Sequence, residues 1–260
     1  MSTAIVIPAR YASTRYPGKP LAVLKGATGI EKTLIQRTWE AAMEGADGLP
    51  VYVATDDERI KDASEGFGAH VIMTDPAARN GTERCAGALS QIDAEVIVNV
   101  QGDAPLTPPS FVRAMIKAMN DAATQVATPV LRCDAETLAN FREDRAHGRV
   151  GGTTAVFGAA MNALYFSKEV VPFVDGNPDP VPVFHHVGLY AYRRAALQAY
   201  AALEPGPLET LEGLEQLRFL ENGLPVTCVE VQAQGRVFWE LNNPIDVDRI
   251  QSVYAREGIL

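Results

Sequence analysis

Three positively charged side chains lie within one short segment near the start of the chain, at Arg10, Arg15 and Lys19. The segment follows an apolar run at residues 4–7, which is typical of a buried parallel strand. Small residues between the cations, such as Ser13, let backbone amides approach an anion whose charge the cations offset. These residues therefore predict a polyphosphate site after the first strand, although a solvated basic loop has the same composition.

An aspartate follows a second apolar run, at residues 95–100, and lies between Gly102 and Pro105. Asp103 in this position can hold Mg²⁺ against bound phosphates, because Mg²⁺ prefers hard oxygen ligands and uses one or two protein carboxylates. Turn chemistry alone also favours the pattern, with the aspartate capping a helix that begins near Pro109. We interpret Asp103 as a magnesium ligand.

The segment Asn80-Gly81-Thr82-Glu83-Arg84 has the composition of a turn that runs into a helix. Free N–H groups at the start of a helix can meet an anion or the edge of a base. Thr82 could equally cap the helix, and Arg84 could be an ordinary surface charge. Taken alone, the segment is a modest indication of a nucleotide site.

Polar residues of the second half give weaker indications. His185 and His186 are adjacent, so they point to opposite faces of a strand and at most one of them enters a cleft. Glu209, Glu212 and Glu215 recur at every third position, which by itself indicates a solvated helix face.

The elements that must position these residues alternate in the first half of the chain. Strands are predicted at residues 4–7, 49–55, 70–73 and 95–100, and helices at residues 30–45, 57–67 and 82–92. This alternation is typical of an α/β protein with a doubly wound, mostly parallel sheet. Right-handed crossovers would bring segments 10–19, 75–84 and 101–105 to one edge of the sheet, where they face the same cleft.

The second half of the chain lacks this alternation. Strands are predicted at residues 150–157, 163–166, 186–192 and 225–230, and helices at residues 193–202, 208–222 and 246–257. Alternating prolines at residues 177–182 predict an exposed loop. We expect one domain over residues 1–260, in which a mixed C-terminal extension of the sheet shapes a second pocket.

Composition argues against several classes of protein. A net charge of −9 over 260 residues argues against nonspecific binding to nucleic acid and to an anionic membrane surface. Apolar stretches all fall short of the roughly 18 residues that a membrane span needs, and the start of the chain does not resemble a signal peptide. Cys85, Cys133 and Cys228 are far apart, so neither disulfides nor structural zinc are expected. We expect a cytoplasmic protein.

Seven segments, taken in order, resemble the motifs of one known family. The segments are IPARYASTRYPGKPL, YVATDDERI, NGTERCAGAL, VNVQGDAPL, ALYFSK, HHVGLYAY and PLETLEGLEQLRFLENG. The family is that of the 3-deoxy-manno-octulosonate cytidylyltransferases, also called CMP-Kdo synthetases. The similarity extends over nearly the whole chain, and seven ordered motifs are far more specific than any one of them.

The resemblance implies an α/β fold of the nucleotide-diphospho-sugar transferase type and transfer of CMP from CTP to the anomeric hydroxyl of an acidic eight-carbon sugar, with release of pyrophosphate. Such a transfer depends on positioning and charge stabilisation, and a covalent nucleophile is not required. Mg²⁺ is the implied cofactor, and a homodimer is the implied assembly. Residues 1–130 would form the CTP-binding half, and residues 131–260 the half for acceptor binding and dimerisation.

Site residues are carried over from the family by position. The implied catalytic residues are Arg10, Lys19 and Asp103. The implied nucleotide-binding residues are Arg10, Ser13, Arg15, Lys19, Asn80, Thr82, Arg84 and Gln101. The implied acceptor-binding residues are Gln101, His186, Tyr190, Glu215 and Gln216, and the implied metal ligands are Asp103 and Asn242.

The chain departs from the family pattern on the metal and acceptor sides. Asn242 stands where the family usually has an aspartate that binds a second metal. An amide oxygen brings no charge, so either the metal is held more weakly or Glu240 or the substrate completes its shell. Asp246 matches a later aspartate of the family and is expected to cap the last helix. The other departures are Thr154 in place of a lysine, Ala104 in place of a glutamate and Lys168 in place of an arginine.

Two alternatives stay open on these residues. Retained CTP chemistry is compatible with a different acidic acceptor, such as a modified ulosonate, a nonulosonate or a phosphonate. Asn242 is also compatible with a catalytically silent paralogue that only binds nucleotide. The motifs HHVGLYAY and LEGLEQLR favour the octulosonate branch.

Overall fold

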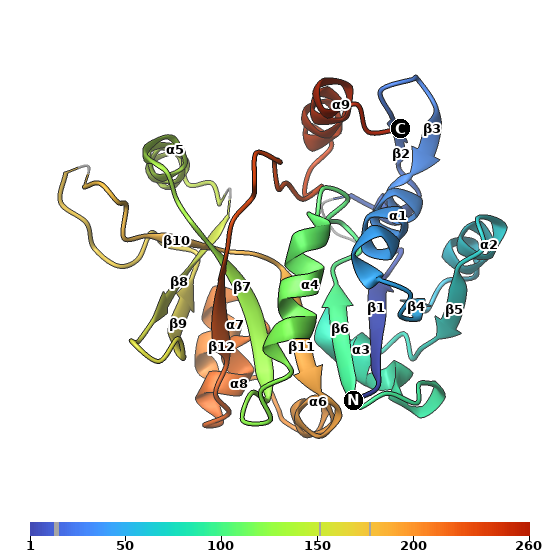
Figure 1. Ribbon diagram of the computed structural model, residues 1–260, viewed down its shortest axis with the longest axis horizontal. Coiled ribbons are helices and arrows are strands. Elements are labelled where there is room, and N and C mark those ends of the chain that lie inside the picture. The colour runs from blue at the N-terminus through green and yellow to red at the C-terminus, as the bar shows by residue number, and fades with distance from the viewer. Residues whose placement is uncertain (13–15, 151, 177) are drawn as a thin grey trace.

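One large sheet runs through the computed structural model, which describes residues 1–12, 16–150, 152–176 and 178–260 (Figure 1). Within these residues its strands are β1 (Thr3–Ala9), β4 (Val51–Thr55), β5 (His70–Met73), β6 (Val96–Val100), β7 (Val126–Arg132), β8 (Thr153–Phe157), β9 (Ala163–Ser167), β10 (Phe184–His186), β11 (Leu189–Arg193) and β12 (Thr227–Val231). Their spatial order is β5-β4-β1-β6-β11-β7-β10-β8-β9, and β12 lies alongside β7. The first half of the chain therefore fills one side of the sheet, and the second half fills the other.

The first half of the sheet is parallel, as the alternating sequence pattern predicts. β1 pairs in parallel with β4 on one side and with β6 on the other, and β4 pairs in parallel with β5. All seven residues of β1 are buried, which explains its continuous apolar sequence. The carboxyl ends of β1 and β6 consequently reach the same edge of the sheet.

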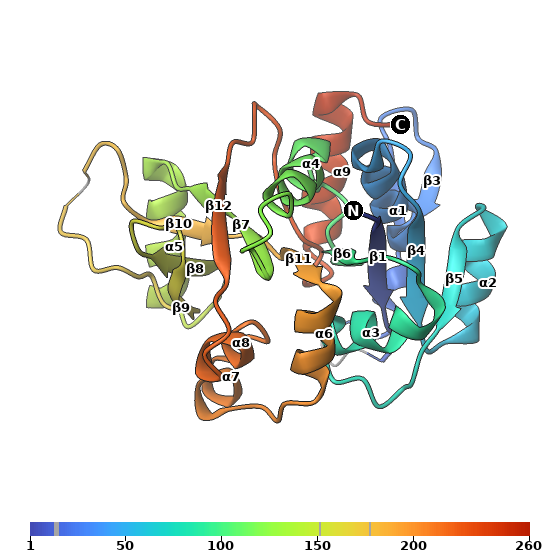
Figure 2. The same cartoon turned by 60° about the horizontal axis from the view of Figure 1, so that its bottom comes forward.

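Helices cover both faces of the sheet (Figure 2). In the described residues they are α1 (Leu34–Ala46), α2 (Glu58–Gly66), α3 (Gly81–Ala88), α4 (Pro109–Ala118), α5 (Ala135–Ala146), α6 (Arg194–Ala201), α7 (Pro207–Glu212), α8 (Leu217–Glu221) and α9 (Asp246–Glu257), with the short 3-10 turns η1 (Lys19–Leu21) and η2 (Leu89–Gln91). α1 and α4 pack together over one face, where Ile35, Phe111 and Met115 are buried. α3 and α6 pack together over the other face, where Tyr192 and Tyr200 belong to a separate core.

The second half of the sheet is mainly antiparallel, which agrees with the predicted mixed extension. β11 runs antiparallel to β6 and β7, β10 runs antiparallel to β7 and β8, and β8 runs antiparallel to β9. Among the strand pairs of this second half in the described residues, only the pair of β12 with β7 is parallel. The strand predicted at residues 186–192 is two strands, because β10 and β11 pair with different parts of β7.

The helix predicted at residues 208–222 is interrupted. Gly213 has a φ of +61°, a left-handed conformation that favours glycine, and it ends α7. The next helix, α8, begins only at Leu217. Glu215 and Gln216 therefore lie in the turn between two helices and not on the surface of one.

Other segments also differ from the predicted elements, among them β7, for which no strand is predicted. The helix predicted at residues 30–45 begins at Leu34, because the preceding residues form β3 (Glu31–Thr33), which pairs with β2 (Val23–Lys25). α5 has no counterpart among the predicted elements. Only Leu138 and Phe141 of that helix are buried, so its sequence shows little apolar periodicity.

The start of the last helix also differs from the expectation. Asp246 is the first residue of α9, and its side chain caps none of the helical N–H groups. Its Oδ2 instead accepts hydrogen bonds from the backbone N–H groups of Asn242 and Asn243, at 3.1 and 2.7 Å. The prediction that Asp246 caps α9 is wrong, and its carboxylate instead fixes the loop that carries Asn242.

Two expectations from composition can be compared with the structure. Cys85, Cys133 and Cys228 are buried and unpaired, as predicted. Among the helices of the described residues, none combines the length and the apolar sequence needed to cross a membrane.

Candidate active site

Three loops meet at the edge of the sheet where β1 and β6 end. A Cβ atom on Gly102 would lie 2.6 Å from the carbonyl oxygen of Pro8, so glycine lets the loop after β6 pack against the end of β1. A Cβ atom on Gly81 would lie 2.9 Å from Oε1 of Gln101, which places the start of α3 against the same loop. The prediction that these loops come together at one edge of the sheet is confirmed at Gly81 and Gly102.

Lys19 and Asp103 form an ion pair at this edge of the sheet. Nζ of Lys19 lies 2.5 Å from Oδ2 of Asp103, although the residues are 84 positions apart in the sequence. Arg10 is exposed, and its Nη1 donates to the carbonyl oxygen of Arg79 at 3.4 Å. The predicted nucleotide-binding residues Ser13 and Arg15 lie outside the described residues.

The segment with Glu240 and Asn242 lies directly beside Asp103. The backbone N–H of Leu241 donates to the carbonyl oxygen of Asp103 at 2.8 Å, and Nδ2 of Asn242 donates to Oε2 of Glu240 at 3.4 Å. Burial and the negative charge of Asp103 raise the pKa of the Glu240 carboxyl. A Cβ atom on Gly188 would lie 2.6 Å from Oε1 of Glu240, so the side chain fills the space that this glycine leaves.

These oxygen atoms could supply part of a set of metal ligands. Two carboxylates, from Asp103 and Glu240, and one amide, from Asn242, come together here. Across the described residues, however, no three side chains of His, Cys, Asp or Glu form a group that could hold a metal ion. A metal at this edge would therefore need oxygen atoms from the substrate as well.

The start of α3 is held by its own side chains. Oδ1 of Asn80 accepts from the N–H of Glu83 at 2.8 Å, so Asn80, and not Thr82, is the cap of the helix. Oγ1 of Thr82 lies 2.9 Å from the hydroxyl of Tyr192. Arg84 is not a surface charge, because only 2% of it is exposed and it contacts residues of the neighbouring strand ends.

The predicted acceptor residues form a buried polar cluster. His186, Tyr190 and Gln216 are 5%, 3% and 2% exposed. The Tyr190 hydroxyl donates to Oε1 of Gln216 at 3.2 Å, and the His186 ring lies 3.0 Å from the hydroxyl of Thr128. Burial, together with neighbouring His185, lowers the pKa of His186 to about 3, so its ring is neutral at physiological pH.

The two adjacent histidines have different surroundings, as the sequence predicts. His186 packs against Phe166 and Tyr190, whereas His185 packs edge-on against Phe141 of α5. Only His186 therefore belongs to the acceptor cluster.

Glu215 connects the start of α3 and the loop after β6 to the cluster of His186, Tyr190 and Gln216. Its Oε2 accepts from the N–H of Thr82 at 3.1 Å, and its Oε1 accepts from Nε2 of Gln101 at 3.3 Å. Burial raises the pKa of Glu215 to about 7. The alternative that Glu209 and Glu215 lie on a solvated helix face is wrong, because Glu209 is only 8% exposed and Glu215 is enclosed by the start of α3.

Three positions that depart from the family pattern now have a structural account. Thr154 is buried, and its hydroxyl donates to the carbonyl oxygen of Glu169 at 2.7 Å. The backbone N–H of Lys168 donates to Glu212 at 2.9 Å, and its Nζ lies over Gly213 at the end of α7. Ala104 is 1% exposed and packs in the turn after Asp103.

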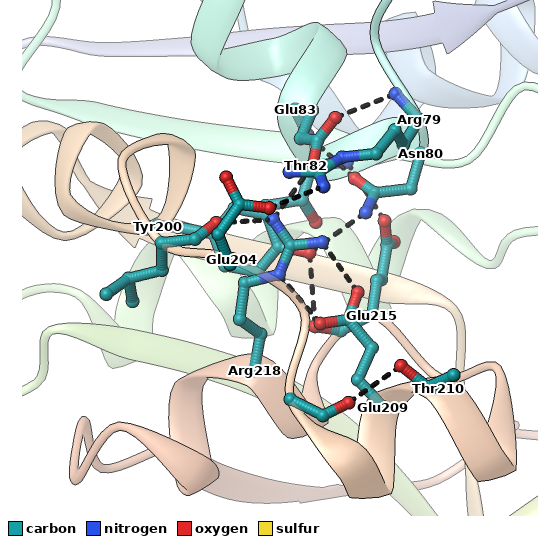
Figure 3. Close-up of polar contacts among 12 residues, drawn as sticks. Arg79, Asn80, Thr82, Glu83, Tyr200, Glu204, Glu209, Thr210, Glu215 and Arg218 are labelled. Carbon is teal, nitrogen blue, oxygen red and sulfur yellow. Dashed lines mark hydrogen bonds and ion pairs between the residues drawn. The ribbon is translucent and has the colours of Figure 1, made fainter.

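Two residues next to Glu215, Tyr200 and Arg218, are absent from the site residues predicted from the sequence. Arg218 lines a cavity of about 270 Å³ together with Asn80, Glu209 and Glu215. The Tyr200 hydroxyl contacts two of these residues, Asn80 and Glu215 (Figure 3). Arg218 is completely buried. Its position inside the apolar run Leu-Arg-Phe-Leu at residues 217–220 is the signal that could have revealed it.

A parallel sheet that presents a lysine and an aspartate at its strand ends, next to a buried polar pocket, is an arrangement suited to nucleotide transfer. The family model described as cytidylyltransferase matches residues 4–229, and the chain belongs to that family.

Named relatives and a solved structure define the similarity further. The chain is 46% identical to a 3-deoxy-manno-octulosonate cytidylyltransferase of Maricaulis maris, over 100% of both chains. It is 39% identical to an 8-amino-3,8-dideoxy-manno-octulosonate cytidylyltransferase of Shewanella sp. (strain ANA-3), over 98% of this chain and 99% of the relative. A solved CMP:2-keto-3-deoxy-manno-octonic acid synthetase, complexed with CTP, superposes with a TM-score of 0.84 at 33% identity, covering 99% of this chain and 100% of that one.

Proposed function

We propose that this protein transfers CMP from CTP to the anomeric hydroxyl of 3-deoxy-manno-octulosonate and releases pyrophosphate. The observation that carries the proposal is a series of contacts that connects the Lys19–Asp103 pair to the buried polar cluster. Gln101, two residues before Asp103, donates to Glu215, and Glu215 directly precedes Gln216 of that cluster. The 46% identical relative over the full length of the chain supports this choice of reaction.

Lys19 and Arg10 would bind the triphosphate. Lys19 already lies at the strand edge, and Arg10 is exposed beside the start of α3, so both cations can approach phosphate oxygens. Ser13 and Arg15 complete this set by resemblance. Their charges and amides would stabilise the negative charge that develops on the pyrophosphate leaving group.

Mg²⁺ is the proposed cofactor, and the residues near Asp103 fit it. Carboxylate and amide oxygens are the hard ligands that Mg²⁺ prefers, and it commonly takes one or two carboxylates together with substrate phosphates. Asp103 and Glu240 would supply the carboxylates, and Asn242 an amide oxygen. When bound, Mg²⁺ would offset phosphate charge, while Lys19 would keep the phosphates oriented.

The acceptor cluster would recognise the sugar by hydrogen bonds. His186 is neutral and brings no positive charge, and its two ring nitrogens face Thr128 and Thr153, so it would shape the sugar site through its protein partners. Tyr190, Glu215 and Gln216 offer further polar atoms on the same side. Because these groups already bond to one another, the pocket is largely preformed.

The 8-amino octulosonate is a second candidate acceptor, because relatives named for it are 39% identical over nearly the whole chain. Turnover assays with CTP, Mg²⁺ and each acceptor, in which pyrophosphate release is measured, distinguish the two candidate acceptors. We expect kcat/KM to be higher for the unmodified sugar. A preference of about 10-fold or more for the amino sugar would replace the proposed acceptor and leave the donor chemistry in place.

A homodimer in the cytoplasm completes the proposal. The donor, a nucleoside triphosphate, is available in that compartment, and family members are commonly homodimers. Sedimentation equilibrium of the purified chain would give twice the 28.0 kDa mass of one copy. A single-copy mass at micromolar concentration would contradict the dimer.

A further inference from the structure

Arg218 is a completely buried guanidinium for which the proposed reaction has no direct use. Its Nε and Nη2 donate to the two carboxylate oxygens of Glu209 at 2.7 and 2.6 Å (Figure 3). Its Nη1 donates to Oε1 of Glu83 at 2.8 Å. One side chain therefore ties α8 to both α7 and α3. Buried ion pairs gain little stability after desolvation, so this one is better explained by the geometry that it fixes.

Tyr200 lies against this guanidinium, with the Arg218 Cζ atom 4.3 Å from its ring centroid. The Tyr200 hydroxyl accepts a hydrogen bond from Nδ2 of Asn80 at 2.9 Å and donates one to the carbonyl oxygen of Glu215 at 3.2 Å. A single hydroxyl thus joins the cap of α3 to the turn between α7 and α8.

Other contacts connect the same two segments. The N–H of Thr82 donates to the Glu215 side chain at 3.1 Å, while within segment 80–83 the N–H of Glu83 donates to Asn80 at 2.8 Å. Glu83 in turn accepts from Arg218. Segment 80–83 and turn 214–216 are therefore held together both in the cleft, by Glu215, and behind it, by Tyr200 and Arg218.

We propose that Tyr200 and Arg218 are positioning residues that set the spacing between segment 80–83 on the donor side and turn 214–216 on the acceptor side. The inference rests on the proposed function, in which the first segment borders CTP and the second borders the sugar. In-line transfer requires the two reactants to be held within reach of each other, and a misplacement of about 1 Å can cost on the order of 10²-fold in rate. A spacing error would lower kcat while each substrate keeps most of its own contacts.

The Tyr200→Phe variant tests the proposal with little disturbance of the core. It removes the bridging hydroxyl but keeps the ring on which Arg218 packs. We expect kcat to fall about 10-fold, with the KM for CTP and for the sugar each changed by less than about 2-fold. Tyr52→Phe is the matched control, because Tyr52 is a half-buried tyrosine of β4 whose ring lies beside His70, away from this cluster. Its kcat should equal that of the wild type.

Substitutions of Arg218 give a graded comparison. Arg218→Lys keeps the charge but loses the two-point contact with Glu209, whereas Arg218→Met leaves Glu209 without its cation and Glu83 paired with Arg79 alone. We expect kcat to decrease in the order wild type, Lys, Met. If Arg218→Met does not fold, Tyr200→Phe decides the question by itself.

The outcomes separate this inference from the proposed function. A wild-type kcat in Tyr200→Phe would overturn the positioning role. An increase in the KM for one substrate without a decrease in kcat would overturn it as well. Absence of turnover in the wild type with CTP, Mg²⁺ and either octulosonate would overturn the proposed function and the inference together. A lower kcat with unchanged KM values would support both.

Discussion

The proposed donor side and the proposed acceptor side of the site are built on different principles. On the donor side, the described cations lie at strand ends with access to solvent, and Lys19 pairs with a carboxylate. On the acceptor side, His186, Tyr190 and Gln216 are buried, and each has a polar partner within the protein. The donor side therefore depends on charge that can change partners, whereas the acceptor side depends on a neutral, preformed arrangement.

This difference indicates how the two sides should respond to substitution. Loss of a charge on the donor side removes a transition-state interaction and should affect the rate strongly. Loss of one hydrogen bond on the acceptor side should chiefly affect sugar binding and protein stability, because neighbouring groups keep the pocket in shape.

The largest expected effect is that of Lys19→Ala. It removes a cation from the triphosphate site and should lower kcat/KM for CTP by on the order of 10²-fold or more, about 3 kcal/mol. Steady-state kinetics at varied CTP measure it. Lys25→Ala is the matched control, since Lys25 forms an exposed pair with Glu31 on the β2–β3 hairpin. Equal kinetics in the two variants would remove Lys19 from the site.

The next effect concerns the magnesium requirement. Asp103→Asn should raise the Mg²⁺ concentration for half-maximal rate by about 10-fold, because one anionic ligand is lost. Asn242→Asp should shift the requirement in the opposite direction. Binding of Mn²⁺, followed by electron paramagnetic resonance, provides a readout that does not depend on turnover. Identical metal titrations in wild type and Asp103→Asn would contradict the ligand role.

A smaller effect is expected from the acceptor cluster. His186→Phe removes the ring nitrogens from the pocket and should raise the KM for the sugar by about 5- to 10-fold, with the KM for CTP unchanged. The neighbouring variant His185→Phe is the control, because that ring packs against Phe141 and not against the cluster. A rise in the KM for CTP in His186→Phe would show that the two sides are not separable in this way.

The smallest effect is a pH dependence of stability. The pKa of Glu215 is raised to about 7 in the folded protein, so the folded state holds a proton that the unfolded state releases near its ordinary pKa of 4.5. Its stabilising contribution is complete below about pH 4.5 and is lost as the pH rises to about 7. Urea unfolding at several pH values in this range gives the free energy of unfolding as a function of pH. This free energy should decline less with rising pH in Glu215→Gln than in the wild type. Equal slopes for both proteins would contradict the raised pKa.

Much of the fold could be predicted because the first half repeats one simple pattern. A buried parallel strand such as β1 is apolar throughout, and the helices that follow carry clear apolar periodicity. The second half offered fewer local signals. α5 buries only Leu138 and Phe141, and the break at Gly213 depends on a single backbone conformation within an otherwise helical sequence.

The site could be predicted only in part, for a related reason. Lys19 and Asp103 follow strands whose ends must meet, so the topology predicts their proximity. The half-buried position of Glu215 depends on contacts with Thr82 and Gln101, which are more than 100 positions away in the sequence. Spacing along a helix cannot reveal such contacts, and for that reason Glu215 resembled a solvated residue.

The ion pair between Lys19 and Asp103 has a further consequence for how ligands enter the cleft. Each side chain lies 2.5 Å from its partner, in the place beside that partner that a ligand of its own sign would take. An anion that binds Lys19 frees Asp103 to bind a cation, and a cation that binds Asp103 frees Lys19 to bind an anion. Thermodynamic linkage then requires each ligand to increase the affinity for the other by the same factor. We therefore expect the triphosphate and the divalent ion to bind cooperatively, with the broken ion pair as the coupling element.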